Sequence, residues 1–270
     1  MKNFANRNFI KNYFFDIKKA FITLKPNLVI IAVSELSSKK VILESLKFPW
    51  TCLAEKPIGY NYAQNIYLYN KIKLIKKKNF FIALNRRHYC STISAKNDLS
   101  KSNEKRHIFI NGQEDLNLQK KINTPKKIID NFMYANSIHL IDYINIFCRG
   151  KLVSIKKLNF LNETPHLLIS KLKFSSGDCA MYSVVHNVKA PWYIALKTTK
   201  VSIVLKPLET YYSNIKKKKN KTYKFDKKFK PGLIEQSRQV LNYLSNKKHN
   251  LSSIETYIKT INLIKKIYEK

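Results

Sequence analysis

A continuous apolar run stands at Leu28-Val29-Ile30-Ile31-Ala32-Val33, directly after the helix-breaking sequence Lys25-Pro26-Asn27. A run without polar alternation is typical of a parallel strand that is buried on both faces. Two further short apolar runs follow it, Thr51-Cys52-Leu53-Ala54 and Phe80-Phe81-Ile82-Ala83-Leu84. These three runs decide the fold, because they predict neighbouring strands of one sheet.

The segments around these runs have helical spacing. Residues 16–21 precede the first run, while 37–46 and 60–76 separate the three runs from one another. Strands that alternate with helices are typical of a doubly wound α/β sheet, so we expect a Rossmann-like parallel sheet here.

A Rossmann sheet normally binds the pyrophosphate of a dinucleotide on a glycine-rich turn after its first strand. This sequence has no glycine before Gly59. Glycines are needed in that turn so that the backbone can approach the pyrophosphate closely. We therefore expect an incomplete sheet, which begins after the first strand, helix and second strand of the usual unit.

A polar connection over residues 96–127 contains one short strand-like piece at 107–110, and an apolar helix follows over 138–147. After this helix the sequence pattern changes from alternating strands and helices to strands alone. Successive strands are then expected, with a turn at Ser175-Ser176-Gly177-Asp178. They span residues 154–160, 166–174, 179–186, 192–198 and 200–205. This order predicts an α+β domain with an open, mostly antiparallel sheet, followed by a lysine-rich loop over 213–230 and helices over 232–245 and 252–268.

The chain is strongly basic, with 51 Lys and Arg against 17 Asp and Glu and a net charge of +34. Such a charge attracts phosphate and permits a nucleic-acid interpretation. However, nearly all of the positive charge is lysine spread along the chain, and arginine, which binds phosphate in a bidentate manner, is scarce. We therefore expect no nucleic-acid binding, although the charge favours anionic substrates.

The four cysteines are far apart and form no CxxC or Cys/His spacing. They are predicted to be free thiols, with no metal site. No apolar run approaches the length of a membrane span, and no signal-peptide core follows Met1. We expect no membrane insertion and a cytoplasmic location.

The tripeptide Glu55-Lys56-Pro57 directly follows the second predicted strand. Both charged side chains would then lie at the carboxyl edge of the sheet, where a dinucleotide's nicotinamide ring binds. A desolvated lysine can accept a proton from a substrate hydroxyl as hydride leaves the adjacent carbon. Taken alone, the tripeptide is also compatible with a surface Glu-Lys pair before a turn proline.

Several motifs occur in an order that resembles the Gfo/Idh/MocA family of oxidoreductases, over about residues 13 to 268. These are residues 25–32, Glu55-Lys56-Pro57, Asn85-Arg86-Arg87, His139-Leu140-Ile141-Asp142, 174–178, Lys206-Pro207-Leu208-Glu209 and 229–233. The later motifs resemble members that act in surface sugar metabolism. The resemblance implies NAD or NADP as cofactor and a sugar or nucleotide sugar as substrate.

The resemblance also implies roles for individual residues. Lys56 matches the catalytic lysine of the family's Glu-Lys-Pro motif, and Glu55 matches the glutamate near the nicotinamide ribose. Val33 and Ser34 occupy the turn where related proteins contact the cofactor, although the family's Pro and His are Ser34 and Ser38 here.

The substrate side is implied by two further motifs. Asn85, Arg86 and Arg87 correspond to residues at the substrate side of the family's site, whereas taken alone they are a solvated basic turn. His139 matches the histidine that acts beside the lysine. The family's aspartate four residues earlier is Ala135, so Asn136 or Ser137 is a candidate polar substitute, and a core histidine is the alternative interpretation of His139.

These observations predict three regions: a partial dinucleotide-binding domain over 1–90, an α+β substrate and oligomerisation domain over 91–255, and a C-terminal helix over 256–270 that packs back on the first domain. The leading functional hypothesis is hydride transfer between NAD(P) and a hydroxyl carbon of a sugar or nucleotide sugar in surface polysaccharide synthesis. The alternative is a truncated or degenerate, non-catalytic member that forms homo-oligomers through its open sheet. Whether the chain is an enzyme stays open at this point, because the glycine-rich phosphate loop is absent.

Overall fold

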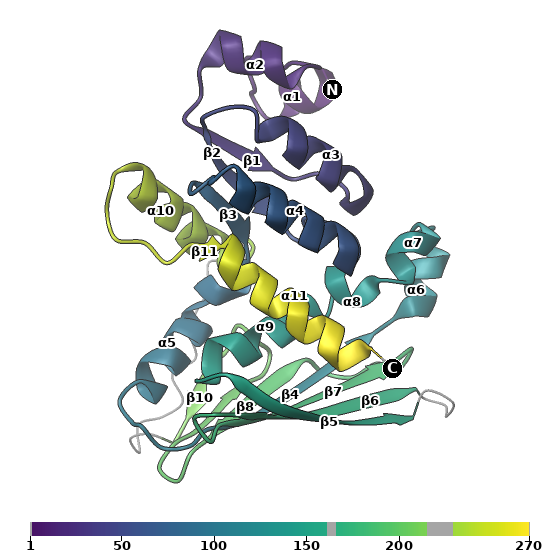
Figure 1. The fold of residues 1–270 in the computed structure, drawn as a ribbon, viewed down its shortest axis with the longest axis vertical. Coiled ribbons are helices and arrows are strands. Elements are labelled where there is room, and N and C mark those ends of the chain that lie inside the picture. The colour runs from purple at the N-terminus through teal and green to yellow at the C-terminus, as the bar shows by residue number, and fades with distance from the viewer. Residues whose placement is uncertain (1, 161–165, 215–228, 270) are drawn as a thin grey trace.

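The computed structural model of the chain describes residues 2–160, 166–214 and 229–269. Two sheets form its framework, and they lie in the upper and lower halves of Figure 1 with helices between and around them. The chain crosses from the first sheet to the second after residue 90 and returns to the first sheet near its C-terminus.

The first sheet has the strand order β1-β2-β3-β11. Its strands are β1 (Leu28–Ile31), β2 (Thr51–Glu55), β3 (Phe80–Ala83) and β11 (Ser252–Ser253). The first three strands are parallel, and β11 is antiparallel to β3. Within the described residues, no strand pairs with the outer edge of β1.

Five helices accompany the first sheet. They are α1 (Lys2–Arg7), α2 (Ile17–Leu24), α3 (Glu35–Ser45), α4 (Tyr62–Leu74) and α10 (Leu233–Leu244). An aromatic cluster holds α2 in place, because Phe21 packs on Phe48 and Trp50 with ring centroids 4.8 Å and 5.3 Å away. The side chain of Asp16 caps α2 by accepting a hydrogen bond from the backbone N–H of Lys19.

The second sheet has seven strands in the order β10-β9-β8-β4-β7-β6-β5. Its strands are β4 (His107–Glu114), β5 (Leu152–Phe160), β6 (Leu167–Phe174), β7 (Cys179–His186), β8 (Tyr193–Lys197), β9 (Ser202–Leu205) and β10 (Tyr212–Ser213). All neighbouring pairs are antiparallel except β4 and β7. Side chains alternate between a buried face and a more exposed face, as expected for a sheet covered on one side.

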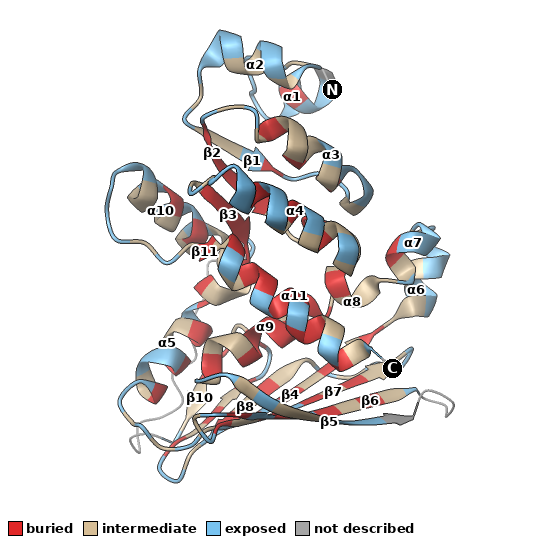
Figure 2. Cartoon of the chain, viewed as in Figure 1, coloured by how far each residue is buried: buried red, intermediate tan, exposed pale blue. Residues whose placement is uncertain are grey.

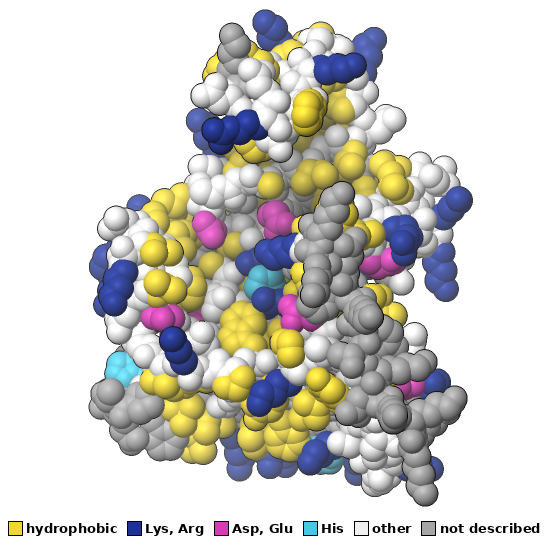
Figure 3. Space-filling view, turned by 180° about the vertical axis from the view of Figure 1, so that it is seen from behind, with side chains coloured by type: hydrophobic (Ala, Val, Ile, Leu, Met, Phe, Trp, Pro, Cys, Tyr) yellow, Lys and Arg dark blue, Asp and Glu magenta, His cyan; other side chains and the backbone are white. Residues whose placement is uncertain are grey.

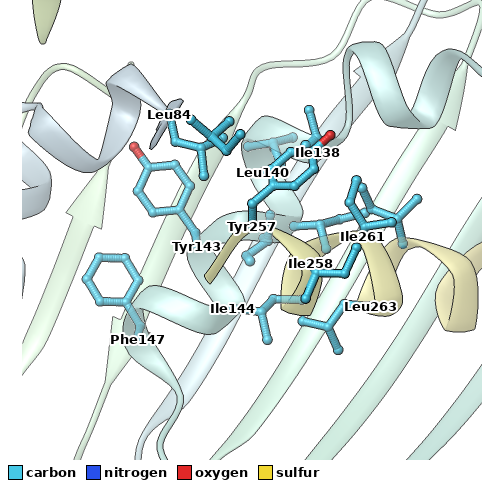
Figure 4. Packing of buried hydrophobic residues seen from close by; sticks show 14 of the residues in the cluster. Leu84, Ile138, Leu140, Tyr143, Ile144, Phe147, Tyr257, Ile258, Ile261 and Leu263 are labelled. Atoms are coloured by element: carbon cyan, nitrogen blue, oxygen red, sulfur yellow. The ribbon is translucent and has the colours of Figure 1, made fainter. Parts of the chain in front are cut away.

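The buried face of the second sheet is covered by helices that also reach the first sheet. The remaining helical elements are η1 (Asn85–His88), α5 (Cys90–Leu99), α6 (Leu116–Lys121), α7 (Lys126–Ile129), α8 (Phe132–Ala135), α9 (Ile138–Phe147) and α11 (Ile254–Tyr268). Burial is concentrated in β2, β3, α9 and α11 (Figure 2). Apolar side chains of α9 and α11, such as Ile144, Ile258 and Ile261, pack together in one core (Figure 4).

This architecture confirms the expected fold class, a partial Rossmann-like parallel sheet followed by a largely antiparallel sheet. The expected domain limits at 90 and 255 stay a prediction. The structure adds that α10 and β11 contact the first sheet: Val240 packs with Leu53, Phe81 and Ala83, and Ser252 pairs with Ile82. Most of the predicted lysine-rich loop, residues 215–228, lies outside the described residues.

The four cysteines are free thiols. None of the helices in the described ranges combines the length and the apolar character that a membrane span needs. Over the same ranges, no cluster of His, Cys, Asp and Glu is suited to hold a metal ion.

Candidate active site

The predicted site residues come from elements that meet between the two sheets. Lys56 follows β2, and η1 with Asn85 follows β3. Because β2 and β3 are parallel, both residues leave the sheet at the same carboxyl edge. His139 is in the first turn of α9, and the Lys56 side chain reaches the Ala135 carbonyl just before this helix.

Lys56 is the central group of this arrangement. Its ammonium group donates a hydrogen bond of 2.6 Å to the backbone carbonyl of Ala135, in the helix just before α9. The pKa of Lys56 is lowered from 10.5 to about 8, mainly by burial; the positive charge of Arg86 contributes to this shift, whereas the negative charge of Glu55 opposes it. Lys56 can therefore exchange a proton near neutral pH.

His139 is close enough to Lys56 to respond to its charge. Burial lowers the pKa of His139 well below 6.5, and the charges of Lys56 and Arg86 act in the same direction. His139 is thus a neutral imidazole at neutral pH, able to donate one hydrogen bond and accept another.

Arg86 and Arg87 have different environments although they are adjacent in η1. Arg87 forms a bidentate ion pair with Asp142 of α9, with nitrogen to oxygen distances of 2.7 Å and 2.5 Å. Asp142 is buried and also accepts a hydrogen bond of 2.7 Å from Thr260 of α11. Through Asp142 and Thr260, Arg87 therefore joins η1, α9 and α11, and its guanidinium is already paired with a carboxylate of the protein.

Arg86 has no ion pair within the part of the chain that the structure describes. Its guanidinium carbon lies 4.6 Å from the ring centroid of Trp192, which is a cation-π distance. Its Nη1 is shielded from solvent and has no hydrogen-bond partner among the described residues. Of the two arginines, Arg86 is the one available to a ligand.

Asn85 is buried and fixes the loop before α10. Its side-chain amide donates a hydrogen bond of 3.1 Å to the backbone carbonyl of Pro231. Gly232 follows with a φ of +79°, and a Cβ at this position would come within 2.3 Å of the Asn85 carbonyl oxygen. Glycine is therefore required here both by the backbone conformation and by the close approach. The contact brings Lys230 to the site, where its charge lowers the pKa of both Lys56 and His139.

Asn136 lies between Ala135, which binds Lys56, and the start of α9. Its side-chain amide is 3.4 Å from the backbone carbonyl of Gln113, a long hydrogen bond, and the indole of Trp192 donates to the same carbonyl at 3.3 Å. The neighbouring Ser137 instead donates a hydrogen bond to the buried carboxylate of Glu114. Of these two candidates, Asn136 is the one whose side chain is held only weakly.

The residues expected at the cofactor have clear positions. Val33 and Ser34 form the exposed turn between β1 and α3, and the Ser34 hydroxyl donates to the Ser37 hydroxyl at 3.1 Å. Glu35, in the first turn of α3, raises the pKa of Lys56 through its charge, so this turn lies near Glu55 and Lys56.

This donor set can be tested against a dinucleotide. The turn at Ser34, the carboxylate of Glu55 and the amine of Lys56 fit the nicotinamide and ribose end. For the pyrophosphate, the described residues supply no glycine turn, because β1 is the edge strand and Gly59 is the first glycine. The residues present therefore fit one end of the cofactor only.

Three residues of this site were not singled out in the sequence: Glu35, Trp192 and Lys230. Lys230 belongs to a motif that was noted, residues 229–233, but no role followed from its position. Trp192 and Lys230 are more than 100 residues from Arg86 along the chain, so no local pattern connects them. Figure 3 shows basic, acidic and histidine side chains gathered on one face, between the upper and lower parts of the molecule.

Comparison with known proteins supports the fold. No protein-family model matches the sequence, and no curated protein matches it. Solved structures do match over nearly the whole chain, and several of them are named as oxidoreductases or dehydrogenases. The chain thus has the fold of the Gfo/Idh/MocA oxidoreductases, as the sequence motifs suggested.

Three of these structures illustrate the similarity. An oxidoreductase from Thermotoga maritima has a TM-score of 0.75 at 16% identity, with 97% of this chain and 82% of that chain covered. The UDP-N-acetylglucosamine 3-dehydrogenase of Acidithiobacillus ferrooxidans has a TM-score of 0.74 at 11% identity, with 98% and 84% covered. The WlbA dehydrogenase of Bordetella pertussis, in complex with NADH and UDP-GlcNAcA, has a TM-score of 0.68 at 11% identity, with 98% and 83% covered.

Proposed function

We propose that this protein is an NAD(P)-dependent oxidoreductase that transfers hydride to or from a hydroxyl carbon of a sugar or nucleotide sugar. The observation that carries the proposal is Lys56, an amine with a pKa of about 8 beside a neutral His139 at the carboxyl edge of a Rossmann-like sheet. The names of similar structures add support, because they include a nucleotide-sugar dehydrogenase and a complex with NADH. A role in surface polysaccharide synthesis is part of the same proposal.

In this proposal Lys56 is the proton acceptor. The nicotinamide, when bound, supplies the hydride acceptor or donor. As a substrate hydroxyl is oxidised, its proton passes to neutral Lys56, while the carbonyl of Ala135 holds the lysine nitrogen in position. His139 is neutral and orients the same hydroxyl by a hydrogen bond. The substrate side is formed by Asn85, Arg86, Arg87 and Asn136. Arg87 acts there through its ion pair to Asp142.

Cofactor binding tests the proposal most directly. We expect NADH or NADPH to bind the full chain, measured by nicotinamide fluorescence, and sugar substrates to be oxidised or reduced at a measurable rate. Lys56→Met should abolish turnover and leave cofactor affinity within a few-fold, because the change removes the proton acceptor while keeping the volume. Lys78→Met, at an exposed lysine after α4, is the matched control and should change neither quantity. No binding at millimolar cofactor would reject the oxidoreductase proposal for this chain.

The second candidate is a non-catalytic protein that acts through homo-oligomerisation. It is favoured because the described residues fit only the nicotinamide and ribose end of the cofactor. A chain that forms oligomers but binds neither nicotinamide cofactor would support this candidate over the first.

A further inference from the structure

A cluster of cations surrounds the proposed reacting groups. Lys56, Arg86 and Lys230 each lower the pKa of His139 through their charges. Two contacts bring their segments together: Lys56 donates to the Ala135 carbonyl just before α9, and Asn85, next to Arg86, donates to the Pro231 carbonyl, next to Lys230. The carboxylates of Glu35 and Glu55 influence Lys56 but are not among the groups that act on His139. The charged groups that act on His139 are therefore all cations.

Among these cations, Arg86 offers directional hydrogen-bond donors through its guanidinium group. Its neighbour Arg87 is neutralised by Asp142, whereas Arg86 has no carboxylate within ion-pair distance in the described ranges. Arg86 shares a side-chain hydrogen bond with Tyr89, but its Nη1 is buried with no partner among the described residues. A buried guanidinium N–H without a partner is costly, and a ligand oxygen would satisfy it.

The remaining contacts fix Arg86 as a binding group. Trp192 stacks on the guanidinium at 4.6 Å and restricts its orientation. On another side, the hydrogen bond from Asn85 to the Pro231 carbonyl holds the loop that carries Lys230. Lys230 is exposed and also makes no ion pair within the described residues. An oriented guanidinium and an ammonium group thus border the same site.

We infer that the substrate carries an anionic group, a carboxylate or a phosphate, which Arg86 and Lys230 bind beside Lys56 and His139. The inference rests on the proposed function and specifies its substrate class as an anionic sugar. The planar guanidinium of Arg86 pairs with two oxygens of either group, and Lys230 adds a point charge. A neutral sugar would leave the buried Nη1 without an acceptor.

The experiment compares ligands that differ only in charge near the sugar ring. Calorimetric titrations of the full chain, without cofactor, would use UDP-glucuronate against UDP-glucose, and glucose 6-phosphate against glucose. We expect at least one ligand with a charged sugar to bind about tenfold more tightly than its partner with an uncharged sugar, equivalent to about 1.4 kcal/mol. Preference within the first pair identifies a carboxylate as the anion, and preference within the second identifies a phosphate.

Variants of the cation cluster test the assignment. Arg86→Gln should remove the preference, and Lys230→Gln, at an exposed position that does not threaten folding, should reduce it several-fold. Arg238→Gln is the matched control, because Arg238 is exposed and pairs only with Glu235 three residues away. Equal affinity for ligands with charged and uncharged sugars in the unaltered protein, or a preference that survives in both variants, would overturn the inference. Neither result would touch the proposed function, which is tested separately by cofactor binding.

Discussion

Single residues give this site its chemistry because their neighbours change their charge states. The side chain of Lys56 would be almost fully protonated at pH 7 in water, since its ordinary pKa is 10.5. With a pKa of about 8, about a tenth of the molecules carry neutral Lys56 at pH 7 and half do at pH 8. Glu55 stabilises the ammonium form and Arg86 destabilises it, so the two neighbours act in opposite directions.

This opposition predicts a pH dependence with a defined sign. Only neutral Lys56 accepts a proton, so kcat/KM for hydroxyl oxidation should rise about tenfold per pH unit below pH 8 and level off above it. Glu55→Gln removes the stabilising negative charge and should move the inflection to lower pH. Arg86→Gln removes a positive charge and should move it to higher pH. Initial rates from pH 6 to 10 measure these shifts, and identical inflections in all three proteins would exclude Lys56 as the titrating group.

Among the elements, α11 is the helix that connects the two halves of the molecule. It packs against α9 on one side and α4 on the other, and it joins the two halves of the molecule (Figures 1 and 4). The buried hydroxyl of Tyr257 donates to the Asn65 side chain at 2.6 Å and accepts from the backbone N–H of Ile58 at 3.3 Å. This contact holds the segment that follows Lys56, so α11 supports the site from behind.

Tyr257→Phe should therefore lower stability. The change leaves the Ile58 N–H without its acceptor inside the protein, which costs about 1–3 kcal/mol. Tyr62→Phe is the matched control in the same helix pair, because the Tyr62 hydroxyl bonds to Asn262 at the surface. The control should change the free energy of unfolding by less than about 0.5 kcal/mol. Urea denaturation of both variants measures the free energy of unfolding. An equal decrease in the two variants would show that the buried hydrogen bonds of Tyr257 stabilise the protein no more than the surface hydrogen bond of Tyr62.

At the scale of the whole molecule, the second sheet has one face covered by helices and one open face. Phe109 of β4 and Met181 of β7 are register partners on the open face, and each is 37% exposed. Neighbouring positions on this face add further apolar surface, including Ile169 of β6 and Val204 of β9. The same face also carries lysines, since Lys171 is the register partner of Met181 on β6. Exposed apolar side chains on an open sheet face favour association, and we propose that this face joins copies of the chain.

Met181→Glu tests this surface. In a symmetric pair of sheets the two new carboxylates would be desolvated in the interface, so the variant should be a monomer where the unaltered protein is an oligomer. Leu74→Glu, on a 74% exposed leucine of α4, is the control and should leave the assembly unchanged. Light scattering after size-exclusion chromatography gives the masses. A monomeric unaltered protein would contradict the proposed association, and an oligomeric Met181→Glu variant would place the interface elsewhere.

The sequence by itself determined the first three strands, the helix over 138–147 and the fold class. The apolar runs at Leu28, Thr51 and Phe80 became β1, β2 and β3, and the helix predicted over 138–147 has those same limits, because strand and helix periods are local properties of the chain. It also indicated Lys56 and His139 as a pair, through motif order rather than through any visible contact.

Only the tertiary structure decided which polar groups are satisfied and which are free. It assigned Arg87 to Asp142 and left Arg86 available, a difference that two adjacent arginines do not reveal in sequence. It also brought Trp192 and Lys230 to the site, and it placed α10 and β11 on the first sheet. These facts depend on contacts between residues that are far apart along the chain, so burial and charge pairing could be known only after the chain had folded.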